Sequence, residues 1–238
     1  MIVHPEKTES MLICCRQKRQ NMKNNSFTVL YKNNPVKQVT NHKLLGIVID
    51  QNLLWQDHVH SLVKQISSSV FQLSQIKHFL NEQSRRMFYF SFIQAKLDYC
   101  SVIWGKCSIS IVKPLFSLQK RAVRLIVFKQ SPGMSINQLF KHTDILPFHS
   151  GVKYNTLLLM FKILNDLAPK YMVSMIKQQQ NHKSNRVILP QAKLDLFKTS
   201  FLYNGCKEWN MLPSIIRSMK SIVVFKKEAK KLLFDTYD

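Results

Sequence analysis

The strongest constraint on the fold is a set of apolar residues that recurs every three or four positions between residues 55 and 80. Because an α-helix makes one turn in about 3.6 residues, this spacing places all of them on one face. The pattern predicts a helix of about seven turns whose apolar face must be buried against other elements. The residues of this face are Trp55, Val59, Leu62, Ile66, Val70, Leu73, Ile76 and Leu80.

A second helix is expected to follow directly. Asn81 is a suitable N-cap, and the carboxylate of Glu82 is favourable in a first helical turn. The residues that follow are apolar nearly all round, so we expect this helix to be buried. They are Met87, Phe88, Tyr89, Phe90, Phe92 and Ile93.

A third helix is expected from about Ile111 to Ile126, and it has two unlike faces. At about 100° per residue, four cations fall on one side: Lys113, Lys120, Arg121 and Arg124. The apolar residues fall on the other side, and they are Ile111, Leu115, Leu118, Ala122, Leu125 and Ile126. The pattern predicts one face in the core and an opposite face that carries positive charge.

The remainder of the chain also favours helices. A Pro-Gly pair at residues 132–133 breaks the chain, and residues 177–199 are polar and mixed, which is typical of a loop. Helices are expected at residues 135–142, 154–167 and 225–234. We find no internal repeat.

Residues 1–50 have a different pattern, with short runs rich in β-branched or aromatic residues. The runs are residues 10–14, 27–31, 36–39 and 44–49, and a turn signal at residues 32–35 favours a hairpin. This small sheet has too little apolar surface to stand alone. The predicted fold class is therefore mainly α, with a small N-terminal β-hairpin or sheet.

The chain is strongly basic, with 35 Lys and Arg against 13 Asp and Glu, a net charge of +22 and a pI near 10. Such charge favours polyanionic partners, either nucleic acid or an anionic membrane surface. An alternative is solubilising charge without a ligand, because the excess of Lys over Arg also fits a bias in coding composition. The amphipathic tail is short, so we expect no membrane association.

Several classes of active site are excluded by spacing. The five glycines lie too far apart for a dinucleotide fingerprint, a P-loop or a Gly-x-Ser-x-Gly elbow. The carboxylates are scattered, and neither the cysteines nor His58-x-His60 have the spacing of a zinc site. The residues alone therefore predict no catalytic centre, no metal and no cofactor.

The start of the sequence has no apolar run behind a cationic segment, and no stretch of about 18 apolar residues occurs. The five cysteines are an odd number at irregular spacing. We therefore expect a protein of the nucleus or cytoplasm with reduced thiols, neither secreted nor membrane-spanning.

The run from Leu45-Gly46 through Asp50 to Leu54-Trp55 and His58-Val59 is similar to the region just beyond the catalytic core of reverse transcriptases from non-LTR (LINE-like, jockey-type) retrotransposons. The resemblance continues in order along almost the whole chain. Lys7-Thr8 resembles the family's fourth palm motif. Later matches are Leu97-Asp98-Tyr99-Cys100 with Trp104-Gly105, Leu118-Gln119-Lys120-Arg121-Ala122-x-Arg124, Trp209-Asn210-Met211-Leu212-Pro213 and Phe225-Lys226.

The departures from this family concern catalysis. The family's Tyr-x-Asp-Asp motif and its earlier palm Asp, which hold two Mg²⁺ ions, do not occur in the sequence. His4 stands where the family usually has Asn, and Leu44 where it usually has Tyr. The resemblance thus implies a polymerase-derived chain that does not itself catalyse. Lys7 would be a relic of triphosphate handling, or simply an exposed lysine before a strand.

The resemblance also implies binding residues. Lys43, Leu45 and Gly46 would belong to a strand like the family's primer grip, although Gly46 fits a plain turn equally well. The cationic face of residues 111–126 would belong to a thumb that lies along a duplex, with a solvated helix face as the alternative. Trp55, Trp104 and Trp209 could each stack on a base, but their apolar surroundings favour core packing.

Three regions are expected: a palm remnant at residues 1–50, a helical thumb-like region at 51–145 and a C-terminal helical region at 146–238. The expected function is that of a non-catalytic C-terminal fragment of a reverse transcriptase that binds RNA–DNA or DNA duplexes without sequence preference. The alternatives are a retained host module that binds nucleic acid or protein, and a decayed remnant without selected function.

Overall fold

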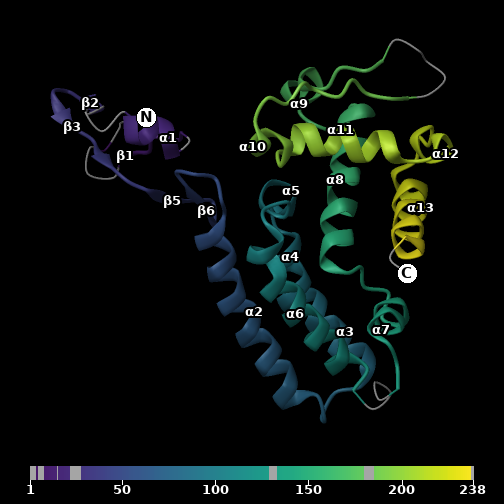
Figure 1. Ribbon diagram of the computed structural model, residues 1–238. Helices are drawn as coiled ribbons and strands as arrows, with labels where there is room; N and C mark the ends of the chain where they lie inside the picture. Colours follow the sequence, from purple (N-terminus) through teal and green to yellow (C-terminus); the bar gives the residue numbers. More distant parts are fainter. Residues whose placement is uncertain are drawn as a thin grey trace. The chain divides into compact units, whose positions relative to one another are not determined.

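The structure is a computed structural model that describes residues 4, 8–14, 16–21, 28–128, 133–179 and 185–236. The chain divides into two compact units, residues 1–61 and 62–238. Most described residues are helical, and the strands are short pairs confined to the first unit apart from one bridge (Figure 1). The predicted fold class, mainly α with a small N-terminal β element, is confirmed.

The first unit holds a short helix and pairs of short strands. The helix is α1 (Arg16–Asn21). The pairs are β1 (Glu9–Ser10) parallel to β4 (Lys37–Gln38), β2 (Leu30–Tyr31) antiparallel to β3 (Asn34–Pro35), and β5 (Asn41–Leu44) antiparallel to β6 (Ile47–Asp50). Each pair stands by itself as a two-stranded sheet. Such small sheets bury little apolar surface.

The N-terminal strands differ from the expected ones in length and pairing. The run at residues 44–49, expected to be one strand, folds into two strands joined by a tight turn. Leu44 pairs with Ile47, and the turn residues Leu45 and Gly46 have φ values of 47° and 87°. Two positive φ angles in a two-residue loop match the right-handed twist of a hairpin. The predicted hairpin forms with a tighter turn, because β2 pairs with β3 and the Val36 N–H donates to the Val29 carbonyl at 2.8 Å. The rest of the expected returning strand, β4, pairs with β1 instead.

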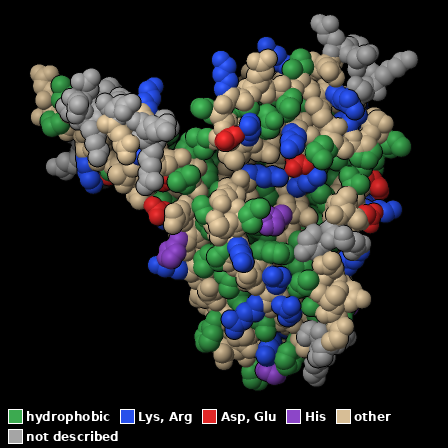
Figure 2. Space-filling model, viewed as in Figure 1, with side chains coloured by type: hydrophobic (Ala, Val, Ile, Leu, Met, Phe, Trp, Pro, Cys, Tyr) green, Lys and Arg blue, Asp and Glu red, His purple; other side chains and the backbone are tan. Residues whose placement is uncertain are grey.

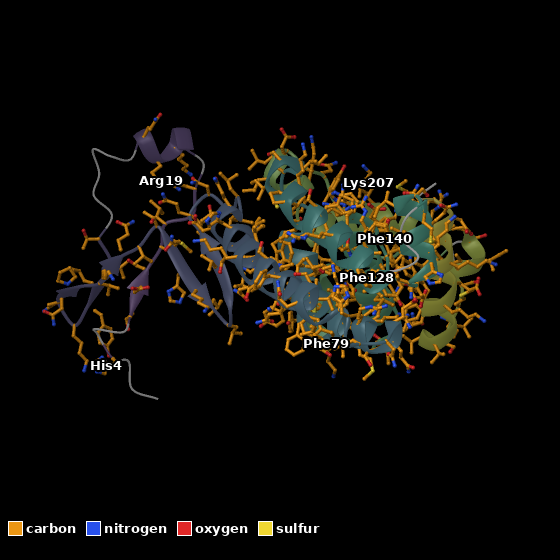
Figure 3. The ribbon with its side chains drawn as sticks, turned by 90° about the horizontal axis from the view of Figure 1, so that it is seen from below. His4, Arg19, Phe79, Phe128, Phe140 and Lys207 are labelled. Atoms are coloured by element: carbon orange, nitrogen blue, oxygen red, sulfur yellow. The ribbon has the colours of Figure 1, made fainter. Side chains whose placement is uncertain are left out.

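Hydrogen bonds made by two side chains, Arg19 and Asp50, hold the first unit together at the end of β6. The guanidinium of Arg19, labelled in Figure 3, donates to the carbonyls of Cys14 and Gln51 and to the side chain of Asn52. The carboxylate of Asp50 accepts hydrogen bonds from the backbone N–H groups of residues 52, 54 and 55. Asp50 therefore shapes the loop that leads into the first long helix.

This long helix, α2 (Gln56–Ile76), confirms the helix predicted from the apolar periodicity. Val59, Leu62, Ile66, Val70 and Leu73 are all buried. The helix ends at Ile76, so Leu80 of the predicted stripe lies in the connection that follows.

The next helices run almost without a break. They are α3 (Glu82–Tyr89), the π-helical segment η2 (Phe90–Gln94), α4 (Ala95–Asp98) and α5 (Ser101–Trp104). Asn81 is the N-cap, and its side chain accepts a hydrogen bond from the Ser84 N–H at 2.8 Å, as predicted.

The expectation that the helix after Asn81 is buried is wrong for half of the apolar residues on which it rested. Met87 is 63% exposed and Phe92 is 49% exposed. The buried face consists of Arg85, Tyr89 and Ile93, which recur every four residues. Composition gave the wrong buried face because that face includes a charged residue, Arg85, whose N–H groups make hydrogen bonds inside the unit.

Arg85 is buried because backbone carbonyls surround its guanidinium. It donates to the carbonyl of Ile126 at 2.7 Å and to the carbonyls of Lys77 and Leu80. These carbonyls lie at or just beyond the C-terminal ends of two helices, where backbone acceptors lack helical partners and the helix dipole favours a cation. One side chain therefore caps two helices.

Three helices form the middle of the second unit. They are α6 (Ile109–Ile126), α7 (Ile136–His142) and α8 (Phe148–Leu164). Helix α8 begins and ends earlier than the predicted 154–167. Its first two turns contain polar residues such as His149, Ser150 and Lys153, so no apolar periodicity marked its start. It packs on α4, α5 and α6 and also on α9, α11 and α13.

The C-terminal helices surround α8 and share a core with it. They are α9 (Lys170–Met175), α10 (Asp195–Lys198), α11 (Phe201–Met211), α12 (Ser214–Arg217) and α13 (Ile222–Asp235). Within this core the ring centroids of Phe161 and Phe225 lie 4.5 Å apart, and those of Trp209 and Phe225 lie 5.8 Å apart. The expected loop at residues 177–199 also contains α10 and an isolated bridge between Gln178 and Val187.

Candidate nucleic-acid interface

The cationic face predicted on α6 is open to solvent. Lys113, Arg121 and Arg124 are exposed, and Lys120 is half-buried with its ammonium 4.8 Å from the centre of the Phe116 ring. Within the described residues, none of these four cations makes an ion pair with a carboxylate. Their charge is therefore free to act on a ligand.

The opposite face of α6 is buried, but it is turned relative to the prediction. The buried residues are Val112, Leu115, Gln119, Ala122, Val123 and Ile126. Ile111, Leu118 and Leu125, which were assigned to the core, are only half-buried. The core face is centred near Gln119, and the four cations lie on the other side of the helix.

Gln119 can be buried because its amide is used inside the unit. Its Nε2 donates to the Tyr89 hydroxyl and to the Leu146 carbonyl, both at 3.0 Å. A polar side chain with partners of this kind is tolerated in a core. This burial sets the rotation of α6 and so aims the cationic face.

The charged residues in and around α6 are all positive over a long stretch of sequence. Seven Lys and Arg residues and no acidic residue occur between Asp98 and Asp144. Figure 2 shows Lys and Arg side chains, with hardly any acidic ones, over the part of the second unit where α3 and α6 lie. Such a surface produces a positive potential that attracts polyanions.

Other arginines serve the structure instead. Arg86 donates to the Thr143 carbonyl and pairs with Asp144 at 3.3 Å. Arg217 is 6% exposed and donates to the carbonyls of Asn210 and Leu212 at the end of α11. With Arg85, they hold helix ends or the turns after them. Sequence patterns did not separate these cations from those of α6, since their partners are distant in the chain.

The residues expected to resemble a primer grip lie at the tip of the β5–β6 hairpin. Lys43 is exposed and pairs with Val48, Leu45 is 83% exposed, and Gly46 occupies the turn. They belong to the first unit and α6 belongs to the second, so they form two separately described surfaces.

Of the expected palm motif, Lys7 lies outside the described residues. Thr8 is described, and its hydroxyl donates to the His4 carbonyl at 2.8 Å.

Two motifs that carry the family resemblance have clear structural roles near α5. Cys100 has a φ of 51°, which lies in the left-handed region that favours glycine. Trp104 is fully buried and donates to the Tyr99 carbonyl at 2.9 Å. A Cβ on Gly105 would lie 2.5 Å from the Ser101 carbonyl and 2.7 Å from Val152, so glycine lets this turn approach α8.

The C-terminal motif is likewise structural. Trp209 is 1% exposed and donates to the Asn185 carbonyl. The Asn210 amide accepts from the Val187 N–H at 3.0 Å and donates to the Val187 carbonyl at 2.8 Å. Burial of Trp104 and Trp209 excludes both from base stacking in this structure.

Acidic residues form no metal-binding group within the described part of the chain. His58 is buried and His60 is exposed, so the two imidazoles do not converge. Glu208 is buried, and its carboxylate contacts the ammonium groups of Lys153 at 2.9 Å and Lys106 at 3.1 Å. Burial alone would raise the pKa of Glu208, but the two ammonium groups overcome this effect and lower the pKa.

Among the described residues, no helix combines the length and the apolar character needed to cross a membrane. Comparison of the chain with protein-family models, with curated protein sequences and with solved structures found no match.

Proposed function

We propose that this chain binds double-stranded nucleic acid, either RNA–DNA hybrid or DNA, through the cationic face of α6. The observation that carries the proposal is the set of four cations, opposite the buried face of one helix and without an acidic partner among the described residues. We expect the chain to bind these duplexes in the nucleus or the cytoplasm, where they occur.

The geometry of the face suits phosphates rather than bases. Lys113 and Arg124 are separated by eleven residues of helix, which is about 16 Å at 1.5 Å per residue. A duplex carries one negative charge per about 1.7 Å of its axis, so a stretch of this length faces several phosphates. Lys and Arg contacts to phosphate position a protein without reading sequence. The expected binding is therefore independent of base sequence.

The resemblance to non-LTR reverse transcriptases supports the same proposal. Within that resemblance α6 corresponds to a thumb helix, and its Leu-Gln-x-Arg-x-x-Arg pattern divides into a buried Gln119 and exposed Arg121 and Arg124. The family's Tyr-x-Asp-Asp motif does not occur in these 238 residues. We accordingly propose a polymerase-derived chain that grips a duplex and does not itself transfer nucleotides.

The decisive measurement is the salt dependence of binding. The affinity for a short RNA–DNA hybrid, measured by fluorescence anisotropy, should fall as KCl increases. Four phosphate contacts predict a slope of log K against log salt of about −3.6. Replacing Lys120, Arg121 and Arg124 by Gln should reduce the steepness by up to about three.

A matched control removes the same charge elsewhere. Lys226, Lys227 and Lys231 are exposed on α13, and their replacement by Gln lowers the net charge equally. This variant should keep most of the salt dependence. A wild-type slope near zero, or equal loss in both variants, would show that α6 does not contact phosphates.

The absence of catalysis needs its own assay. The purified chain, given a primed RNA template, nucleoside triphosphates and Mg²⁺, should leave the primer unextended. Primer extension would overturn the non-catalytic part of the proposal and leave the binding part intact.

A further inference from the structure

The second unit contains a cavity apart from the cationic face. Its volume is about 170 Å³, and it opens where η2, α4, α8 and the segment at residues 144–146 meet. A smaller chamber of about 10 Å³ adjoins it, with room for about one water-sized group. Gln94, Asp98, Leu146 and Gly151 line both spaces.

One residue that lines the small chamber has an unpaired acceptor. Gln119 is 1% exposed and lines this chamber. The Leu146 carbonyl can only accept a hydrogen bond, so the amide nitrogen of Gln119 must face it, and Oε1 faces away. This Oε1 has no partner among the described residues. A buried acceptor without a partner costs free energy, which a donor in the chamber would recover.

Asp98 places a negative charge beside this acceptor. Its Oδ1 accepts hydrogen bonds from Gln94 Nε2 and Asn155 Nδ2, both at 2.9 Å, and both donors are neutral. Asp144, the other acid of the cavity, is neutralised by Lys230 at 2.7 Å and Arg86 at 3.3 Å. Asp98 makes no ion pair with a described residue, so it is the acid of the cavity that lacks a salt-bridge partner.

The outer cavity has apolar walls that include Phe90, Ile145, Leu146 and the ring of Tyr154, and Lys230, which pairs with Asp144, also lines it. A cavity of about 150 Å³ can hold a benzene ring. The π-helical segment η2 forms one wall, and its Gln94 is held by the Tyr89 hydroxyl at 2.6 Å. Segments of this kind often occur at functional sites.

We propose that this cavity binds a small primary amine with an apolar body. The ammonium group occupies the inner chamber, where it donates hydrogen bonds to the Asp98 carboxylate and to Oε1 of Gln119. The apolar body fills the outer cavity between Phe90, Ile145 and Tyr154. The site is independent of the cationic face of α6 and attracts ligands of the opposite charge.

Binding can be tested on the full chain with benzylamine as the probe, followed by NMR titration. Benzyl alcohol has the same apolar body without the charge. Its affinity should be lower than that of benzylamine by about tenfold or more. Asp98→Asn keeps an acceptor for Gln94 and Asn155, so the variant should fold while losing about tenfold in benzylamine affinity. Asp166→Asn removes an exposed acid elsewhere and should have no effect.

A second variant narrows the cavity without destabilising the fold. A Cβ on Gly151 would meet no atom within 4 Å, and Gly151 lies inside α8. Gly151→Ala should therefore raise the melting temperature and weaken benzylamine binding. Equal binding of amine and alcohol, equal affinity of the Asp98→Asn and Asp166→Asn variants, or unchanged binding by Gly151→Ala would each overturn the proposal.

Discussion

The two units of this chain are stabilised in different ways. In the first unit Ile47 and Val59 are the described apolar residues with less than 9% exposure. Hydrogen bonds that Asp50 accepts and that Arg19 donates hold the loops. In the second unit large side chains such as Trp104, Phe140, Phe161 and Phe225 are fully buried. Burial of apolar surface is the larger source of stability. The comparison teaches that short strand pairs contribute local order, whereas the helices supply cooperative stability.

The largest expected difference between the units is in amide hydrogen exchange. Amides of β5 and β6 should exchange by local opening at a cost of a few kcal/mol at most, because little apolar surface is lost. Amides of α6 and α8 should approach the free energy of global unfolding, about 5–15 kcal/mol. Mass spectrometry on the intact chain measures both. Strands protected as strongly as α6 would contradict the contrast.

Close packing inside the helical unit is tested by Gly105→Ala. The added methyl would meet the Ser101 carbonyl and Val152 at less than 3 Å, so α5 must move away from α8. We expect a loss of about 1–3 kcal/mol in the free energy of unfolding, measured by urea denaturation. Gly151→Ala, on the same pair of helices, is the control and should not destabilise.

Removal of a carboxylate should change the free energy of unfolding in the second unit but not in the first. Glu208→Gln leaves the ammonium groups of Lys106 and Lys153 without their carboxylate, and we expect a loss of about 2 kcal/mol at pH 7. The pKa of Glu208 is lowered in the folded chain. Its contribution is therefore fully present above the usual glutamate pKa of about 4.3 and disappears as the pH falls through the lowered folded value.

Urea denaturation of wild type and Glu208→Gln between pH 7 and pH 3 measures this difference. The two curves should converge at the acid end. Glu9 of the first unit, whose pKa is lowered by hydrogen bonds with His42 and Lys37, lies at the surface. Glu9→Gln should leave the unfolding of the helical unit unchanged. A constant difference between wild type and Glu208→Gln at every pH would exclude the ion pair as its cause.

The smallest effect concerns two non-glycine residues with left-handed backbones, one in each unit. Cys100 has a φ of 51° and Leu45 a φ of 47°. Cys100→Gly should stabilise the helical unit by up to about 1 kcal/mol because the strain is relieved. Leu45→Gly should slow exchange in the β5–β6 hairpin only. Cys100→Ala keeps the strain and should bring no gain in urea denaturation.

Local patterns predicted much of the second unit and part of its candidate interface. The apolar stripe of α2, the Asn81 cap and the four cations of α6 depend on residues within one or two turns of each other. The first unit was predicted less well, because short strands depend on their partners. The run at residues 44–49 looked like one strand, since nothing in its composition marks Leu45 as a turn residue.

The features that local patterns did not predict depend on interactions between residues that are distant in the sequence. Arg85 looks like a surface cation in the sequence, yet carbonyls at the ends of two helices receive it in the core. The rotation of α6 depends on Tyr89 and Leu146, which lie about 30 positions from Gln119 and on opposite sides of it. The cavity beside Asp98 arises where four segments meet. Periodicity reports which side of a helix is apolar, but the groups that satisfy a buried polar atom come from elsewhere in the fold.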